Sequence, residues 1–211
     1  MKDVLEKIKE ARENSKPRRF VQTWDLIINL KGIDLKKPEN RFNFDVVLPS
    51  GRGKTTKVVI IADSMISEAK KLADLVITKE ELEELGKDKK KAKKLAKEYD
   101  YFFGEAPLMP LIGRFLGPVL GPRGKMPKPF PPKADLKSIV DNARKSVRAV
   151  LKETPVISVP VGIETMKDED IATNIEAVFN AIKERLPKGQ NNIKSVMLKL
   201  TMGRPVKIKV M

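Results

Sequence analysis

The first fifty residues carry two kinds of apolar pattern. Residues 2–14 place apolar side chains every three or four positions, which predicts an opening helix that Pro17 ends. Residues 21–30 alternate instead, and residues 42–48 repeat the alternation, so each segment predicts a half-buried strand. The apolar face of the first strand is formed by Trp24, Leu26, Ile28 and Leu30. We expect the two strands to form an antiparallel pair.

The next fifty residues have a different pattern of apolar positions. A continuous apolar run at 58–62 is typical of a strand that is buried on both faces of a parallel sheet. Helical and extended patterns then alternate, with expected helices at 64–72, 78–85 and 87–97 and expected strands at 75–77 and 101–103. Thr78 and Glu81 form a capping-box pattern at one helix start. This alternation predicts an open α/β domain with a parallel sheet.

Residues 104–132 contain eight of the fifteen prolines and five glycines, which predicts a packed loop with one short helix. Four basic side chains of this stretch are expected to point outward: Arg114, Arg123, Lys125 and Lys128. Long structured loops are usually functional. A helix is predicted at 135–151, where Pro155 stops it.

After Pro155 the sequence returns to the helical and alternating apolar patterns of the first fifty residues. A short strand at 156–161, a long helix at 168–186 and a strand at 196–210 that breaks at 201–205 are expected. The two ends therefore resemble each other, and the middle differs. We predict an α/β and α+β protein of two domains, in which residues 1–55 and 156–211 build an α+β domain and residues 56–155 form an inserted Rossmann-like α/β domain.

Composition restricts the chemistry. The 211 residues include 43 Lys and Arg against 28 Asp and Glu, a formal net charge of +15, and they include neither cysteine nor histidine. Disulfides, thiolate metal sites and histidine bases are excluded, and we expect no cofactor and no metal. No apolar run is long enough for a membrane helix, and the first residues lack the apolar core of a signal peptide. We expect a cytosolic protein without membrane contact.

Two further patterns invite an enzymatic interpretation. Gly51–Thr55 resembles the end of a phosphate-binding P-loop, but Leu48 stands where the first glycine belongs and a strand follows instead of a helix. An interstrand turn is the simpler interpretation, and a basic loop that contacts a nucleic-acid backbone is the alternative. Carboxylates at strand ends, namely Asp63, Asp100 and Glu105, are interpreted as caps and solvated charges.

Basic and aromatic residues point toward a polynucleotide. Arg18-Arg19-Phe20 is followed by Thr23 and Asp25, so cations that fix phosphates stand beside an aromatic ring and short polar groups. Thr201-Met202-Gly203-Arg204 interrupts an apolar strand with a glycine that permits close backbone approach. No DNA-binding motif is visible, which favours RNA. The lysine run at 87–97 is expected to be a solvated helix face or a nonspecific phosphate contact.

One segment is distinctive enough to suggest a family. Residues 116–127 resemble the signature of the ribosomal protein L-one family, whose members belong to the mobile side stalk of the large ribosomal subunit; the segment reads Leu-Gly-Pro-Val-Leu-Gly-Pro-Arg-Gly-Lys-Met-Pro. Thr201-Met202-Gly203 and the strand that begins near Arg19 resemble the family's other motifs, in the same order. Arg204-Pro205 and the compact length are more similar to the archaeal branch than to the bacterial one.

The resemblance implies a function without catalysis. Members bind a folded region of the large-subunit ribosomal RNA through the domain that contains both termini, assist release of deacylated tRNA from the exit site, and often repress translation of their own messenger RNA. Carried over to this chain, the RNA-binding residues are Arg19, Phe20, Thr23, Asp25, Thr201, Met202, Gly203 and Arg204. Asp25 would accept hydrogen bonds from a ribose 2′-OH or a base amino group. We expect the free protein to be a monomer in the cytoplasm.

Two other functions stay open on the residues alone. An α/β enzyme or binding protein could use a phosphorylated or nucleotide ligand at the strand ends of the inserted domain. A basic chaperone or nucleoid protein would bind by charge alone, with no effect of Phe20 or Met202. The signature loop at 116–127 could have either a structural role or a secondary contact.

Overall fold

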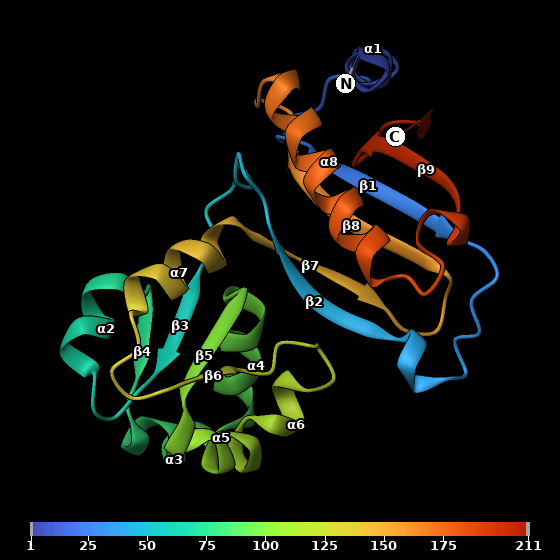
Figure 1. Ribbon diagram of the computed structural model, residues 1–211. Coiled ribbons are helices and arrows are strands. Elements are labelled where there is room, and N and C mark those ends of the chain that lie inside the picture. Colours follow the sequence, from blue (N-terminus) through green and yellow to red (C-terminus); the bar gives the residue numbers. More distant parts are fainter. Residues whose placement is uncertain (1, 210–211) are drawn as a thin grey trace. The chain divides into compact units, whose positions relative to one another are not determined.

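The computed structural model describes residues 2–209, which divide into two compact units. Unit 1 consists of the chain up to Lys54 and from Lys145 onward, and unit 2 is Thr55–Arg144. Figure 1 shows the ribbon of each unit. The mixed α/β and α+β class predicted from the sequence is confirmed.

Unit 1 contains a four-stranded antiparallel sheet in the order β10-β9-β1-β8. Strand β1 is central, because Thr23–Leu30 pairs on one side with β8 and on the other with β9. A separate antiparallel ribbon joins β2 to β7. The remaining bounds in unit 1 are α1 (Lys2–Glu13), η1 (Pro38–Asn40), β2 (Phe42–Val47), β7 (Ser146–Leu151), β8 (Val156–Ile163), α8 (Asp168–Arg185), η3 (Gly189–Asn192), β9 (Ile193–Leu200) and β10 (Val206–Ile208).

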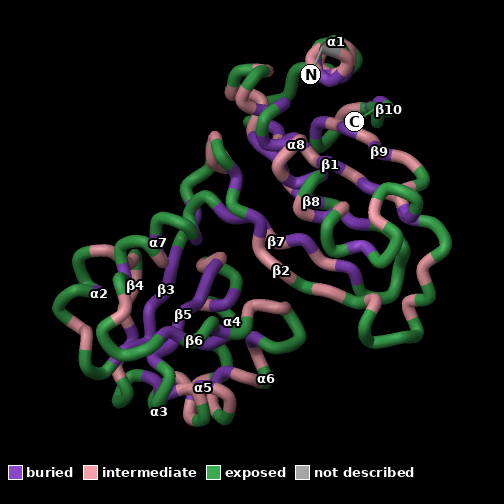
Figure 2. The backbone as a smooth tube through the Cα atoms, viewed as in Figure 1, coloured by how far each residue is buried: buried purple, intermediate pink, exposed green. Residues whose placement is uncertain are grey.

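The core of unit 1 lies on one face of this sheet. Burial alternates strictly along β1, as the sequence pattern predicted: Trp24, Leu26, Ile28 and Leu30 are buried and the residues between them are half-exposed. The buried face packs against α1 and α8 in one apolar cluster (Figures 1 and 2). The opposite face keeps half-exposed side chains such as Asp25 and Lys199. This alternation is what a sheet covered on one side requires.

Two expectations about unit 1 were wrong. The strands at 23–30 and 42–47 do not pair with each other, because β1 is occupied by β8 and β9 on its two edges. The helix expected over 135–151 ends at Lys145, and residues 146–151 form β7. Val147, Ala149 and Leu151 are buried at a period of two, and this segment pairs with β2. The second unit boundary therefore lies near residue 145 instead of residue 155.

Unit 2 is a parallel sheet in the order β4-β3-β5-β6. The inner strand β3 (Val58–Ile61) is buried at every position, as the continuous apolar run predicted. One apolar cluster lies on each face of the sheet. The bounds in unit 2 are β3 (Val58–Ile61), α2 (Ile66–Leu72), β4 (Leu75–Ile77), α3 (Lys79–Lys87), α4 (Lys89–Glu98), β5 (Tyr101–Glu105), η2 (Ala106–Leu108), α5 (Met109–Phe115), α6 (Gly117–Leu120), β6 (Lys128–Phe130) and α7 (Leu136–Lys145).

The proline-rich stretch is more regular than expected. It contains two short α-helices and an added edge strand, because the prolines of α5 and α6 stand in the first turn, where no intrahelical N–H is needed. Lys125 does not point outward as expected. Its Nζ donates to the carbonyls of Ala96 and Tyr99, at 3.1 and 2.6 Å, and so ties the signature loop to the end of α4. Within unit 2 this loop therefore has a structural role.

Candidate nucleic-acid interface

The turn after β9 is fastened to the start of β1. The Thr23 N–H donates to Thr201 Oγ1 at 3.0 Å, and the Thr23 carbonyl accepts from both the N–H and the Oγ1 of Thr201, at 3.0 and 3.2 Å. Three hydrogen bonds thus join two residues that are 178 positions apart in sequence. The first strand motif and the C-terminal motif are parts of one structure.

A buried glutamine extends this connection. Gln22 is fully buried, and its Oε1 accepts from the Met202 N–H at 3.1 Å. Its own backbone is held by Glu164, which accepts from the Gln22 N–H at 3.2 Å and donates its N–H to the Gln22 carbonyl at 2.8 Å. Because these bonds engage the backbone of the turn, they leave the Met202 side chain free to face solvent.

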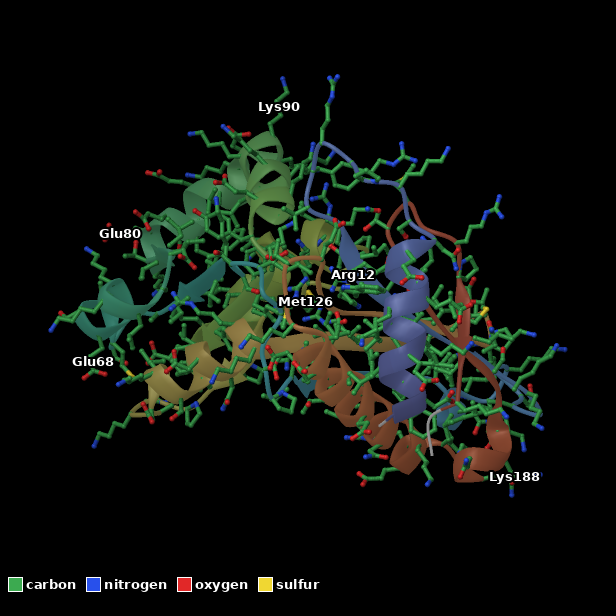
Figure 3. The ribbon with its side chains drawn as sticks, turned by 90° about the horizontal axis from the view of Figure 1, so that it is seen from above. Arg12, Glu68, Glu80, Lys90, Met126 and Lys188 are labelled. Carbon is green, nitrogen blue, oxygen red and sulfur yellow. The ribbon has the colours of Figure 1, made fainter. Side chains whose placement is uncertain are left out.

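Arg12 supports the same region from α1 (Figure 3). Its guanidinium donates to the Glu164 carbonyl and to Asp168, both at 2.7 Å, and lies 5.6 Å from the centre of the Trp24 ring. The ion pair with Asp168 is half-exposed, so we assign it a modest energy. Its geometric effect is to hold α1, β8 and the start of α8 together beneath the turn.

Three apolar side chains are exposed at this end of the sheet. Phe20 is 52% exposed, Val21 is 56% exposed and Met202 is 58% exposed. Arg19 and Arg204 are exposed beside them in sequence. Exposed apolar side chains next to cations can contact bases while the cations neutralise phosphates.

Asp25 lies on the open face of the sheet, one alternation beyond Thr23. Partial burial raises its pKa above the ordinary value, and the positive charge of Lys199, its cross-strand partner, offsets part of that effect. Lys199 also donates to the Thr201 carbonyl at 2.7 Å. The Asp25 carboxylate is therefore an acceptor that points away from the core, close to the turn.

Gly203 is required by a close contact. A Cβ at this position would lie within van der Waals overlap of Ser15 Oγ, whose hydroxyl donates to the Ala11 carbonyl at 2.9 Å. The turn therefore packs directly on the end of α1, and only glycine fits without a shift.

This contact makes a testable prediction. Gly203→Ala should push the turn away from α1 and weaken RNA binding by about tenfold, or about 1.4 kcal/mol. Ser15→Ala removes the clashing oxygen, so the double variant Ser15→Ala/Gly203→Ala should regain most of the lost affinity. RNA affinities of the wild type, the two single variants and the double variant give the interaction energy between positions 15 and 203. Strictly additive effects would disprove the packing argument.

The structure brings most of the predicted residues together. Thr23 and Thr201 bond directly, Met202 and Gly203 continue the same turn, and Asp25 follows on the same strand. Arg19, Phe20 and Arg204 flank this group as exposed residues without a bond that fixes them to it. The sequence analysis missed three supporting residues, Arg12, Gln22 and Glu164. Gln22 did carry a signal, because a polar residue stands there in phase with the buried face of β1.

Glu105, the carboxylate at the end of β5 in unit 2, has a structural role. Burial acts to raise the pKa of Glu105, but hydrogen bonds from Ser64 and from the N–H of Asp63 outweigh it and lower that pKa. Glu105 thus fastens the turn after β3. Among residues 2–209 no group of three or more acidic residues is placed to hold a metal ion, and no helix is long and apolar enough to cross a membrane.

Comparisons with known proteins identify the family. The model of the Ribosomal protein L1p/L10e family matches residues 8–204. The chain belongs to this family. Similar relatives named large ribosomal subunit protein uL1 come from Thermococcus kodakarensis, with 53% identity over 98% of this chain and 96% of the relative, and from Methanothermobacter thermautotrophicus, with 50% identity over 98% of each. The relative from Methanocaldococcus jannaschii is 49% identical over 98% of this chain and 94% of its own length.

Membership has two consequences for the interpretations above. The family consists of structural ribosomal proteins, so the chain is not an enzyme, and the resemblance of 51–55 to a P-loop does not indicate nucleotide hydrolysis. All three relatives come from archaea, in agreement with the archaeal character that Arg204-Pro205 indicated.

Proposed function

We propose that the protein is a constituent of the large ribosomal subunit that binds the side-stalk region of the large-subunit ribosomal RNA through unit 1. It acts on the cytoplasmic ribosome, assists release of deacylated tRNA from the exit site and represses translation of its own messenger RNA. Family membership and the names of the relatives support the ribosomal role. The arrangement of unit 1 supports the RNA contact.

The proposal rests on the three hydrogen bonds between Thr23 and Thr201, which we call the clamp. It uses backbone and hydroxyl groups to fix a turn whose Met202 side chain is left exposed. Met202 joins Phe20 and Val21 as exposed apolar side chains at this end of the sheet, and such a group is typical of an interaction surface. The clamp therefore supports a preformed surface on which little conformational entropy is lost when RNA binds.

Each exposed residue has a separate task in this proposal. Arg19 and Arg204 contact phosphates, which sets affinity and its dependence on salt. Phe20 and Met202 pack against bases or riboses, which requires a folded RNA of fitting shape. Asp25 accepts from a ribose 2′-OH or a base amino group, and its charge excludes it from the phosphate backbone.

The test compares two RNAs of equal length. The purified protein is titrated with a side-stalk ribosomal RNA fragment and with an unrelated structured RNA across a salt series. We expect the stalk fragment to bind at least about 1,000-fold more tightly, in the range of specific recognition, and to keep most of that advantage at moderate salt. Equal affinities with parallel salt slopes would show binding by charge alone.

The two regulatory roles need their own measurements. A messenger leader that mimics the ribosomal site should compete with the stalk fragment for one site, and Met202→Asp should weaken both to the same degree. Assistance in tRNA release should appear as slower departure of deacylated tRNA from ribosomes that lack the protein. Independent, non-competitive binding of the leader would exclude repression through this surface.

Because the pKa of Asp25 is raised, we expect replacement of this residue to have opposite effects on fold stability and on RNA affinity. Since burial raises this pKa in the folded state, the ionised carboxylate costs folding free energy in full above the raised pKa, and the cost shrinks as pH falls from there to the ordinary pKa of an aspartate, below which it is gone. Asp25→Asn should therefore raise the melting temperature at pH 7, with the gain shrinking toward pH 3. The same change should weaken RNA binding about fivefold, because a neutral amide is the weaker acceptor. Melting curves against pH and RNA titrations check both halves.

If Asp25→Asn instead left RNA affinity unchanged while stabilising the fold, the residue would have no part in recognition. If it lowered stability at pH 7, the assigned direction of the pKa would be wrong.

A further inference from the structure

The loop between β2 and β3 has no role in the surface described so far. It contains Ser50-Gly51-Arg52-Gly53-Lys54, and both glycines have left-handed backbone angles, with φ of +71° at Gly51 and +70° at Gly53. Two such residues two positions apart make a sharply folded loop that other residue types would strain. Its shape is thus specified by the sequence.

A buried amide holds this loop in place. Asn174 of α8 is fully buried, and its Nδ2 donates to the Gly51 carbonyl at 2.9 Å and to the Val161 carbonyl at 2.8 Å. Its Oδ1 accepts from the Ser50 N–H at 3.1 Å. All the main hydrogen-bonding groups of one core side chain are used to attach the loop to β8 and α8. Such a fully satisfied buried group fixes position more than it adds stability.

The loop lies at the end of the sheet that carries the RNA surface. A Cβ on Gly53 would come within 2.7 Å of Ile163 Cγ1 and of Met166 Sδ, so the loop backbone packs directly on the end of β8. Ile163 is the cross-strand partner of Thr23. Thr23 is in turn clamped to Thr201. One strand, β8, therefore separates the loop from β1 and the turn at 201–203.

The charges at this end favour a polyanion. Lys54 is exposed and Arg52 is half-exposed, and the neighbouring segments add the exposed Arg18, Arg19 and Arg204. The acidic groups nearby are Glu164, which bonds to the Gln22 backbone, and Asp168, Glu169 and Asp170 in the first turn of α8, of which Asp168 pairs with Arg12. Cations at the margin of a surface that contacts bases are the groups that contact flanking phosphates.

We propose that the loop 50–54 is a second contact of the same RNA. In this contact Lys54 and Arg52 bind phosphates of the RNA segment that extends beyond the surface formed by Phe20 and Met202. The proposal rests on the function proposed above. It assigns the glycine pattern at 51–53 a purpose other than nucleotide binding, since the loop presents cations at the edge of a sheet instead of enclosing a ligand.

The test is a salt series with single variants. Lys54→Gln should lower affinity for the stalk fragment about fivefold at 0.15 M salt and reduce the slope of log K against log salt by about one, since one phosphate contact is lost. Lys54→Arg should retain both values. Lys31→Gln is the matched control, because Lys31 is an exposed lysine that follows the opposite end of β1.

The outcomes separate the two proposals. If Lys54→Gln and Lys31→Gln behave alike, whether both are silent or both lose affinity, the loop is no specific contact, while the proposed function stands on the preference for stalk RNA. If the wild-type protein shows no such preference, the proposed function fails and the loop contact fails with it. Melting temperatures of the lysine variants should equal that of the wild type, because these side chains are exposed.

Discussion

Met202→Asp is expected to reduce affinity for the side-stalk RNA by about 100-fold, or about 2.8 kcal/mol. Met202 is 58% exposed, and the clamp between Thr23 and Thr201 holds its backbone, so the substitution changes the surface without removing a core contact. The loss has two sources. Complete burial of a methionine side chain is worth about 1.5–3 kcal/mol, and a carboxylate placed beside phosphates adds repulsion.

Two variants control for the size and charge of this change. Met202→Leu keeps an apolar side chain and should remain within about threefold of the wild type. Val156→Asp adds the same charge to unit 1 at an exposed position, but at the end of β8 that pairs with Asn29, far from Thr23. Affinity that falls equally in Val156→Asp and Met202→Asp would contradict the assigned surface, because net charge alone would then explain both.

Trp24→Ala is expected to have the largest effect on stability. The indole is fully buried in the unit 1 core, and Arg12 lies over its ring. Its removal should cost about 3–5 kcal/mol through lost apolar burial and the cavity that remains. Trp24→Phe should cost less, since most of the ring volume is kept. Because Trp24 lies directly beneath Thr23 and Asp25 in the sheet, RNA affinity should fall with the folded fraction of unit 1.

The distribution of aromatic residues makes this prediction measurable by unit. Trp24 is the only tryptophan, and both tyrosines, Tyr99 and Tyr101, belong to unit 2. Denaturant unfolding followed by circular dichroism gives the total change, and tyrosine emission in Trp24→Ala reports unit 2 alone. The midpoint of the tyrosine transition should equal that of Trp24→Phe. A parallel fall in both units would contradict the assignment of this core to unit 1.

Local patterns predicted most elements of the fold, and they were wrong where local patterns are ambiguous. The alternation along β1 and the continuous run at 58–61 identified which faces are buried, because burial on one or two faces leaves a direct trace in the sequence. Residues 146–151 fit a helical period through Val147 and Val150 as well as a strand period. The pairing with β2 decided the matter, and that contact is long-range.

The candidate site shows the same division. Its residues could be named from motifs at 19–25 and 201–204, but the motifs give no account of why they belong together. The bonds between Thr23 and Thr201, the support of Met202 by Gln22 and the packing of Gly203 on Ser15 depend on chain segments brought together by folding. The register of β1 against β9 sets these contacts, and no local pattern encodes that register.

Hydrogen exchange of the protein with and without stalk RNA tests the central claim most directly. Our account predicts slower exchange of backbone amides at 18–25, 50–54 and 200–204 in the complex, with the residues around Lys31 and Val156 unchanged. The Met202→Asp variant at the same RNA concentration should lose this protection. Protection confined to unit 2, or spread evenly over every lysine-rich segment including 87–97, would contradict the proposal that unit 1 recognises the RNA through this end of its sheet.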